Sequence, residues 1–90
     1  MKTIWKYLLS IEDEQEIEIP SPAMVLCVQT QNHIPCIWCL VDPEMGLIKK
    51  KFRLVGTGWE INNSIEDLKY IGTTLLLKGM IVYHLFEILT

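Results

Sequence analysis

The segment around Gly56-Thr57-Gly58 has residue types and spacing that favour anion binding. Lys51 and Arg53 precede it two positions apart, so an extended strand would place both on one side, within reach of one phosphate group. Glycines let backbone N–H groups converge on an anion, and an aromatic ring offers a stacking surface for a base. The candidate ligand-binding residues are Lys51, Arg53, Gly56, Thr57, Gly58 and Trp59, with a nucleotide as the best candidate ligand.

The same segment also has a structural interpretation, which we favour. Gly56 and Gly58 can end a strand in a bulge or turn, while the basic residues 49–53 cover a strand edge. A lone GxG without a following helix is a weak phosphate motif. The acidic run 12–18 can also lie opposite the basic strand and neutralise it by cross-strand pairing.

A second set of residues, His33, Cys36 and Cys39 with Cys27 upstream, contains the ligand types that zinc prefers. If residues 34–41 form a strand, Cys36 and Cys39 project from opposite faces because they are three positions apart. A redox CxxC needs a helix N-terminus to lower its thiol pKa, and no helix is expected here. We therefore predict packing cysteines, no metal and no cofactor, and stability that a chelator leaves unchanged.

No catalytic set emerges from the remaining polar residues. His84 shares a strand face with Met80, Val82 and Phe86, so we interpret it as a half-buried strand histidine. The serines lack the sequence context of a nucleophile elbow. The carboxylates of residues 12–18 are most simply a solvated face. We predict that the protein is not an enzyme.

Composition excludes some partners. The 90 residues carry 8 basic and 11 acidic side chains, a net charge of −3, which argues against general duplex nucleic-acid binding. No apolar run approaches a membrane span, and the first residues lack a signal-peptide pattern. Three cysteines, an odd number, favour a reducing cytoplasm. The apolar share of 50% predicts one folded domain over residues 1–90, with either a dense core or some apolar surface that meets another chain.

The elements that would position these residues follow a period of two, which is typical of strands. A hairpin at the centre of the sheet is expected from 23–31 and 34–41, and a type I′ turn at Lys78-Gly79 joins the last two strands. One short helical turn at most is expected, near residues 64–69. These patterns predict an all-β antiparallel barrel or sandwich of about seven strands. The main expected strands are 2–9, 14–19, 23–31, 34–41, 49–56, 70–77 and 80–89.

Trp38 lies in the middle of the expected central hairpin, between apolar neighbours. We therefore expect its side chain to be substantially buried, and a Trp38→Ala substitution to cost about 3–5 kcal/mol of stability.

The motifs KTIWKY, IPCIW-x-LVDPE, FRLVGTG and YIGT occur in this order along the chain. Together they resemble a family of short proteins of unknown function that are encoded by tailed bacteriophages and prophages. The resemblance covers roughly residues 2 to 86. It implies a small accessory protein made in a bacterial cytoplasm, with no assigned activity and no site residues to transfer.

This setting suggests a function by analogy with other phage accessory proteins. We expect a binding protein that blocks a host protein, including a defence protein, or sequesters a small signalling nucleotide. A minor structural or assembly component of the virion is the alternative. Unpaired sheet edges and surplus apolar residues predict a homo-oligomer.

Overall fold

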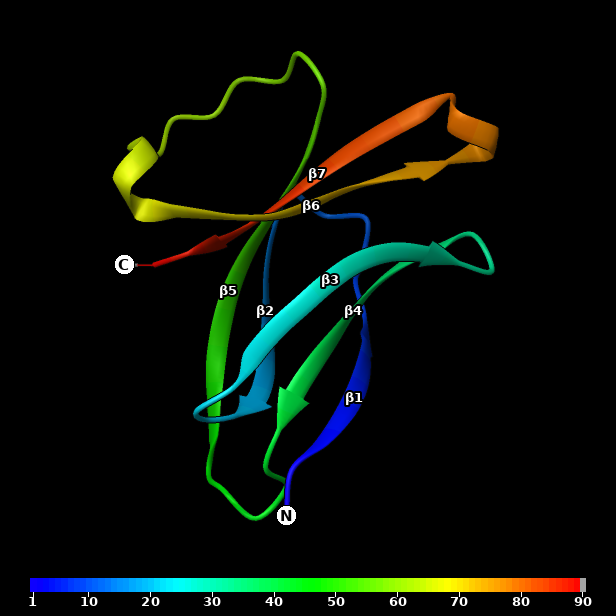
Figure 1. The fold of residues 1–90 in the computed structure, drawn as a ribbon. Coiled ribbons are helices and arrows are strands. Elements are labelled where there is room, and N and C mark those ends of the chain that lie inside the picture. The colour runs from blue at the N-terminus through cyan, green and yellow to red at the C-terminus, as the bar shows by residue number, and fades with distance from the viewer. Residues whose placement is uncertain (90) are drawn as a thin grey trace.

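The computed structural model describes residues 1–89, which form seven strands and two short 3-10 turns (Figure 1). The strands and turns in chain order are β1 (Thr3–Leu8), β2 (Glu14–Pro20), β3 (Met24–Gln31), β4 (Ile34–Val41), β5 (Leu47–Gly56), η1 (Ile65–Asp67), β6 (Leu68–Leu76), η2 (Leu77–Gly79) and β7 (Ile81–Ile88). The predicted all-β class with seven strands is confirmed.

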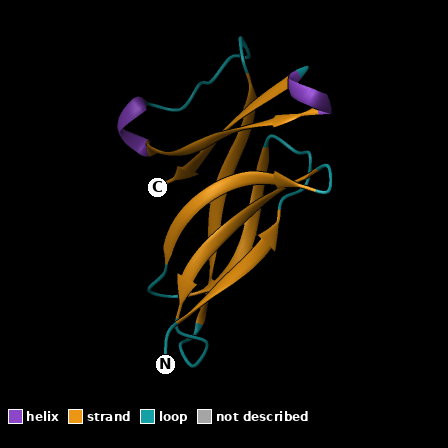
Figure 2. Cartoon of the chain, turned by 45° about the vertical axis from the view of Figure 1, so that its right-hand side comes forward, coloured by secondary structure: helices purple, strands orange, loops and turns teal. Residues whose placement is uncertain are grey.

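The strands form two antiparallel sheets in the orders β1-β4-β3 and β2-β5-β7-β6. Figure 2 shows the two sheets as layers and the long loop, residues 57–64, that joins β5 to η1. The expected central hairpin is present as β3 and β4, but only β4 is central, because β3 forms an edge of the three-stranded sheet. A period of two identifies strands but does not say how they divide between sheets.

The layers meet most closely where β3 crosses β6. The Thr30 Oγ1 and Thr74 Oγ1 atoms are 2.6 Å apart and share a hydrogen bond. A Cβ added at Gly72 would lie 2.9 Å from Val28 Cγ1, so glycine allows this approach. The two sheets therefore cover each other along one side, and β1 and β2 lie at the edges of the other side.

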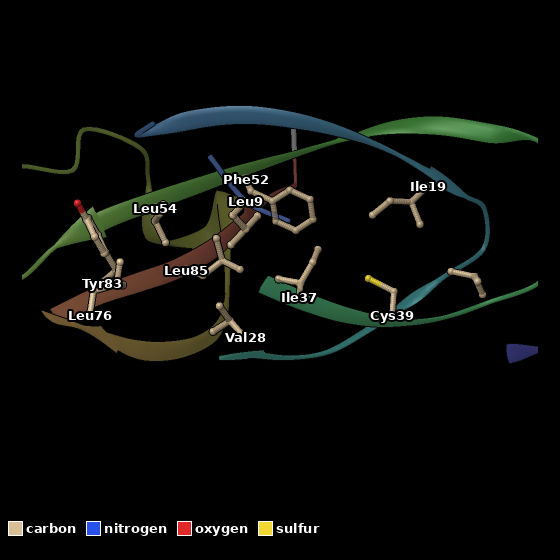
Figure 3. Packing of buried hydrophobic residues seen from close by; sticks show 11 residues of the cluster. Leu9, Ile19, Val28, Ile37, Cys39, Phe52, Leu54, Leu76, Tyr83 and Leu85 are labelled. Atoms are coloured by element: carbon tan, nitrogen blue, oxygen red, sulfur yellow. The ribbon is translucent and has the colours of Figure 1, made fainter. Parts of the chain in front are cut away.

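The hydrophobic core lies between the two layers. In Figure 3, Phe52 and Leu85 of one sheet point toward Ile37 and Val28 of the other. Ile19 of β2 is also fully buried, as the alternation of Ile and Glu along this strand predicts. Apolar residues on one face of each sheet thus provide the main stabilising term.

Trp38 lies outside the core between the two sheets. It pairs with Lys6 and with Cys27, on the face of the β1-β4-β3 sheet that points away from the second sheet. Its burial is intermediate, so most of the side chain is covered, as expected, although not by the second sheet. Neighbours along a strand do not tell which face meets the second sheet.

Two hairpin turns use left-handed backbone conformations. Asn32 and His33, with φ of 51° and 66°, join β3 to β4. Lys78 and Gly79, with φ of 56° and 87°, form the central pair of the β6–β7 turn, and the Met80 N–H donates to Leu77 O at 3.1 Å. These angles match the expected type I′ turn. The short helical turn η2 lies at this hairpin, and η1 lies within the region 64–69 where a single turn was expected.

Candidate functional site

Strand β2 lies antiparallel to β5, and its acidic residues face the basic ones. Glu14 pairs with Arg53, and Glu16 pairs with Lys51. Glu18 likewise lies opposite Lys49. The predicted cross-strand placement of the acidic and basic runs is thus found, and it lowers the positive potential that an anion would meet beside β5.

Arg53 is held by groups of the protein itself. Its Nε and Nη2 atoms donate to the two carboxylate oxygens of Asp13, at 2.9 and 2.7 Å. Its Nη1 atom donates to the side-chain oxygens of Asn62 and Asn63, at 3.3 and 2.6 Å. Only 4% of Arg53 is exposed, and the hydrogen bonds to Asp13 raise the pKa of the guanidinium above its usual value. Arg53 therefore acts as a structural clamp, while Lys51 on the same side of β5 is exposed.

The Gly56-Thr57-Gly58 segment is a tight turn. The Trp59 N–H donates to Gly56 O at 3.1 Å, and Gly58 occupies the third position with φ of 87°. The Thr57 N–H donates to Val82 O at 3.4 Å. Two of the N–H groups that an anion cradle would need are thus directed at carbonyl oxygens, as expected for the structural corner.

Trp59 folds back over this turn. A Cβ added at Gly56 would lie 2.7 Å from the Trp59 ring, and the ring meets Tyr83 edge-on with centroids 6.0 Å apart. The side chain still has 54% of its surface exposed. Gly56, Thr57, Gly58 and Trp59 are therefore brought together, but Arg53 is directed to Asp13 rather than to them.

Lys51 borders a hollow of about 570 Å³ beside β2. The lining of this hollow also includes Glu12, Glu14 and Glu16. Three carboxylates around one ammonium group favour a cation or water over a phosphate. The six candidate residues thus do not form one concentrated basic site.

His84 lies in a chain of hydroxyl groups that no sequence pattern reveals. Its Nε2 atom is 2.7 Å from Thr57 Oγ1, and its Nδ1 atom is 3.0 Å from Thr73 Oγ1. The Tyr70 hydroxyl is in turn 2.6 Å from Thr73 Oγ1. Both ring nitrogens therefore have partners, as expected for a satisfied, half-buried strand histidine. The link to Thr73 follows from the cross-strand pair of β6 and β7, which only the register reveals.

The cysteines have the strand geometry that was expected. Cys36 and Cys39 project from opposite faces of β4, and His33 lies in the turn before this strand. Cys39 faces the core, where burial raises the pKa of its thiol to about 11. Cys36 donates a weak hydrogen bond from Sγ to Ile34 O at 3.3 Å.

The outer face of the β1-β4-β3 sheet has a distinctive composition. We define this outer face by three rows of paired residues: Ile4, Leu40 and Met24; Lys6, Trp38 and Cys27; Leu8, Cys36 and Gln29. Of these nine positions only Lys6 and Gln29 are polar, which leaves seven apolar ones. Ile4, Leu8 and Met24 have 55%, 59% and 57% of their surface exposed.

The corresponding face of the β2-β5-β7-β6 sheet has two parts. Its paired positions on the first two strands are charged: Glu14, Glu16 and Glu18 on β2, and Lys49, Lys51 and Arg53 on β5. On the other two strands His84 and Thr73 are polar, and the remaining paired positions are mostly apolar: Val82, Phe86 and Ile88 on β7, and Leu68, Tyr70 and Leu75 on β6. The outer face of β1-β4-β3 is apolar across all three of its strands, so it is the second candidate for a functional surface.

An apolar hollow of about 370 Å³ lies at one end of the outer face. Met24, Leu40 and Met45 line it, while Lys2 and Asp42 also border it. Methionine side chains adapt to differently shaped apolar groups. This hollow can therefore receive an apolar side chain of a partner.

Within the part of the chain that the structure describes, residues 1–89, no helix has the length and apolar character needed to cross a membrane. Comparison with curated proteins and with solved structures finds no significant match. A family model described as "Domain of unknown function (DUF7352)" matches residues 1–89. Because this match covers nearly the whole chain, the protein belongs to the family of domains of unknown function DUF7352.

Proposed function

We propose that this protein is a non-enzymatic binding protein that occupies the surface of a partner protein with the outer face of its β1-β4-β3 sheet. The observation that carries this proposal is the composition of that face. It is apolar at seven of nine paired positions across all three strands, and Ile4, Leu8 and Met24 are more than half exposed. The outward face of the other sheet is charged along β2 and β5 and is mostly apolar only along β7 and β6. Contiguous exposed apolar surface is typical of protein contact sites.

Most of the binding energy of such a contact should come from the centre of the face. Burial of apolar surface contributes about 25 cal/mol per Å², and large side chains that enter a hollow dominate the binding energy. Trp38 lies in the middle row, half-buried, and the hollow lined by Met24 and Leu40 lies beside it. The face therefore offers both an aromatic side chain, Trp38, and a hollow that can accept an apolar side chain of the partner.

Charge on the outer face specifies the partner further. Lys6 is the one charged residue among the nine positions, and its Nζ atom donates to the side chain of Gln31 at 2.7 Å. Lys2 borders the hollow at the end of the face, but Asp42 borders it as well and offsets that charge. The complementary surface is apolar and carries a carboxylate opposite Lys6.

The phage resemblance supplies the setting for this proposal. In that setting the partner is a host protein in the bacterial cytoplasm, including a defence protein, and binding blocks its surface. A place in the virion is the alternative, in which the same face would contact another particle protein. Sequestration of a nucleotide has less support, because Arg53 binds Asp13 and the hollow beside Lys51 is lined with glutamates.

The test compares two charge substitutions at equally exposed apolar residues. Met24→Glu alters the outer face, and Leu75→Glu alters β6 in the other sheet, where Leu75 has 54% of its surface exposed against 57% for Met24. Each variant and the unchanged protein would be used for affinity capture from lysate of the infected host, followed by a direct binding measurement with the captured protein.

We expect the unchanged protein and Leu75→Glu to bind the same partner, and Met24→Glu to weaken the binding by about tenfold or more. Circular dichroism would check that both variants are folded. Retention of the partner by folded Met24→Glu, or an equal loss in both variants, would contradict the proposal. Recovery of the protein within purified particles would favour the virion alternative.

A further inference from the structure

The two sheets have four outer strands, and three of these edges are protected. Strands β3 and β6 lie against each other, joined by the Thr30–Thr74 hydrogen bond. Strand β2 carries alternating glutamates and ends at Pro20, two features that discourage pairing with another chain. Strand β1 has no proline and a single charged residue, Lys6, whose Nζ atom donates to Gln31 of the same chain, and nearly all of the strand is exposed. It is the edge that remains open to strand addition in the described residues.

Hydrogen-bond alternation shows which backbone groups of β1 face this opening. The Leu9 N–H donates to Pro35 O at 2.9 Å, so Leu9 directs its backbone groups toward β4. Because this direction alternates along an antiparallel strand, Thr3, Trp5 and Tyr7 also face β4. The N–H and C=O groups of Ile4, Lys6 and Leu8 consequently face the open edge.

We propose that two copies of this chain pair through their β1 strands, antiparallel and related by a two-fold axis at Trp5. Two three-stranded sheets then join into one continuous sheet of six strands. A strand edge of this kind is self-complementary under a two-fold rotation, since each copy offers the same donors and acceptors.

The side chains select the register. Hydrogen-bonded pairs across the new interface must join residues whose backbone groups face outward. A register centred on Lys6 puts two ammonium groups opposite each other, and one centred on Ile4 pairs Lys6 with Lys2. A register centred on Trp5 pairs Ile4 with the partner's Lys6 and avoids both repulsions. Registers centred on Thr3 or Tyr7 avoid them too, but Trp5 lies near the middle of β1, so its register overlaps more of the strand.

This register also brings the two Trp5 side chains together. They form a non-hydrogen-bonded pair, the closer type of cross-strand pair, in which aromatic side chains contact each other. Trp5 has 41% of its surface exposed in the single chain, and its neighbour Ile4 has 55%. Pairing covers part of this apolar surface and also joins the two outer faces into one larger surface.

The first experiment measures mass against concentration by light scattering and analytical ultracentrifugation. We expect the full chain to reach twice its mass of 10.5 kDa in a reversible equilibrium. Lys6→Pro removes an outward N–H without loss of a hydrogen bond to β4, whereas Lys6→Ala keeps that N–H. Lys6→Pro should raise the dissociation constant of the dimer by about tenfold or more. Because the dimer is two-fold symmetric, the substitution removes two hydrogen bonds at once.

A second experiment tests the register independently of that variant. Trp5→Cys should form a disulfide between copies on mild oxidation, since residues in such a pair lie within disulfide distance. Thr3→Cys is the matched control. In this register the residues at position 3 of the two copies are offset by four residues along the strands, roughly 13 Å, which is too far for a disulfide. Both cysteines are introduced in a Cys39→Ala background, because Trp5 pairs with Cys39 and a disulfide could otherwise form within one chain. Both variants then share the native Cys27 and Cys36.

A monomer at all concentrations overturns the proposal. An unchanged dimer in a folded Lys6→Pro variant would also overturn it. A Thr3→Cys variant that cross-links more readily than Trp5→Cys would overturn it as well. Met24 lies on β3, at the far side of the sheet from β1, so Met24→Glu should leave the dimer intact. Failure of the dimer and failure of the proposed protein-binding face are therefore distinguishable.

Discussion

Arg53 connects three parts of the chain that are distant in sequence. Its guanidinium contacts Asp13, which precedes β2, and Asn62 and Asn63 in the loop that follows the glycine turn. Arginine suits this position because its planar group donates to a carboxylate through two parallel hydrogen bonds. The residue holds a long loop against the sheet, and this explains why it is buried although it is charged.

Replacement of Arg53 should therefore affect stability. We expect Arg53→Ala to lower the free energy of unfolding by about 2–3 kcal/mol, below the cost of breaking a fully buried pair because Asp13 is 42% exposed. Lys51→Ala, two residues away and exposed, should change it by less than about 0.5 kcal/mol. Urea unfolding followed by circular dichroism measures both. Equal stability of the two variants would contradict the clamp.

The buried thiol of Cys39 predicts a loss of stability in alkali. Burial raises its pKa from 9.0 to about 11, and the nearby Lys50 lowers it only in part. Above about pH 9 the unfolded chain loses this proton while the folded protein keeps it, so the unfolded state gains relative stability. We expect a loss of about 2–3 kcal/mol between pH 9 and pH 11.

Burial also raises the pKa of the Tyr7 hydroxyl, and this contributes in the same direction at still higher pH. Thermal unfolding of the unchanged protein and of Cys39→Ala across this pH range provides the comparison. The variant should be less stable near neutral pH but should show a shallower decline. An identical slope in both proteins would show that Cys39 is not responsible.

Among the elements, the turns depend most directly on residue type. Gly58 occupies the position of positive φ in the turn after β5, at 87°, and nothing lies within 4 Å of an added Cβ. Gly46, in the turn between β4 and β5, has equally open surroundings but no positive φ. The two glycines thus separate the effect of backbone strain from that of crowding.

We expect Gly58→Ala to cost about 1–2 kcal/mol, because an L-residue pays that amount in the left-handed region. Gly46→Ala should stay within about 0.5 kcal/mol of the unchanged protein, or be slightly stabilising. Thermal or urea unfolding of the two variants side by side measures the difference. A cost at Gly46 as large as that at Gly58 would contradict the strain argument.

At the scale of the whole molecule, the close crossing of β3 and β6 couples the two sheets. Gly72 belongs to β6 and Val28 to β3, and an added methyl group at Gly72 would lie 2.9 Å from Val28 Cγ1. Val28 is 5% exposed, so its side chain has little room to move aside. The separation of the layers at this point therefore depends on both residues.

Gly72→Ala should lower stability by about 1–3 kcal/mol through overpacking. Val28→Ala removes the atoms with which the new methyl group collides, so Gly72→Ala should cost much less in that background. A double-mutant cycle measured by urea unfolding gives the coupling between the two sites. If the stability changes of the two substitutions simply add, the added methyl group does not collide with Val28, and the overpacking argument is contradicted.

The sequence by itself determined the local structure of this protein. Alternating Ile and Glu in β2 and the turn residues Lys78-Gly79 specify a strand and a hairpin through interactions within a few positions. The all-β class followed from such patterns. The strand geometry that separates Cys36 from Cys39 also followed from the period of two.

Tertiary structure decided which face of each strand meets the core and which groups meet across the fold. Trp38 is outward-facing because its sheet packs on the second sheet through Ile37 and Cys39, and no local signal distinguishes these alternatives. Arg53 binds Asp13, 40 positions away, instead of standing free beside the glycine turn. Contacts between residues so distant in sequence depend on which strands pair in each sheet. The two-residue period of a strand does not specify that pairing.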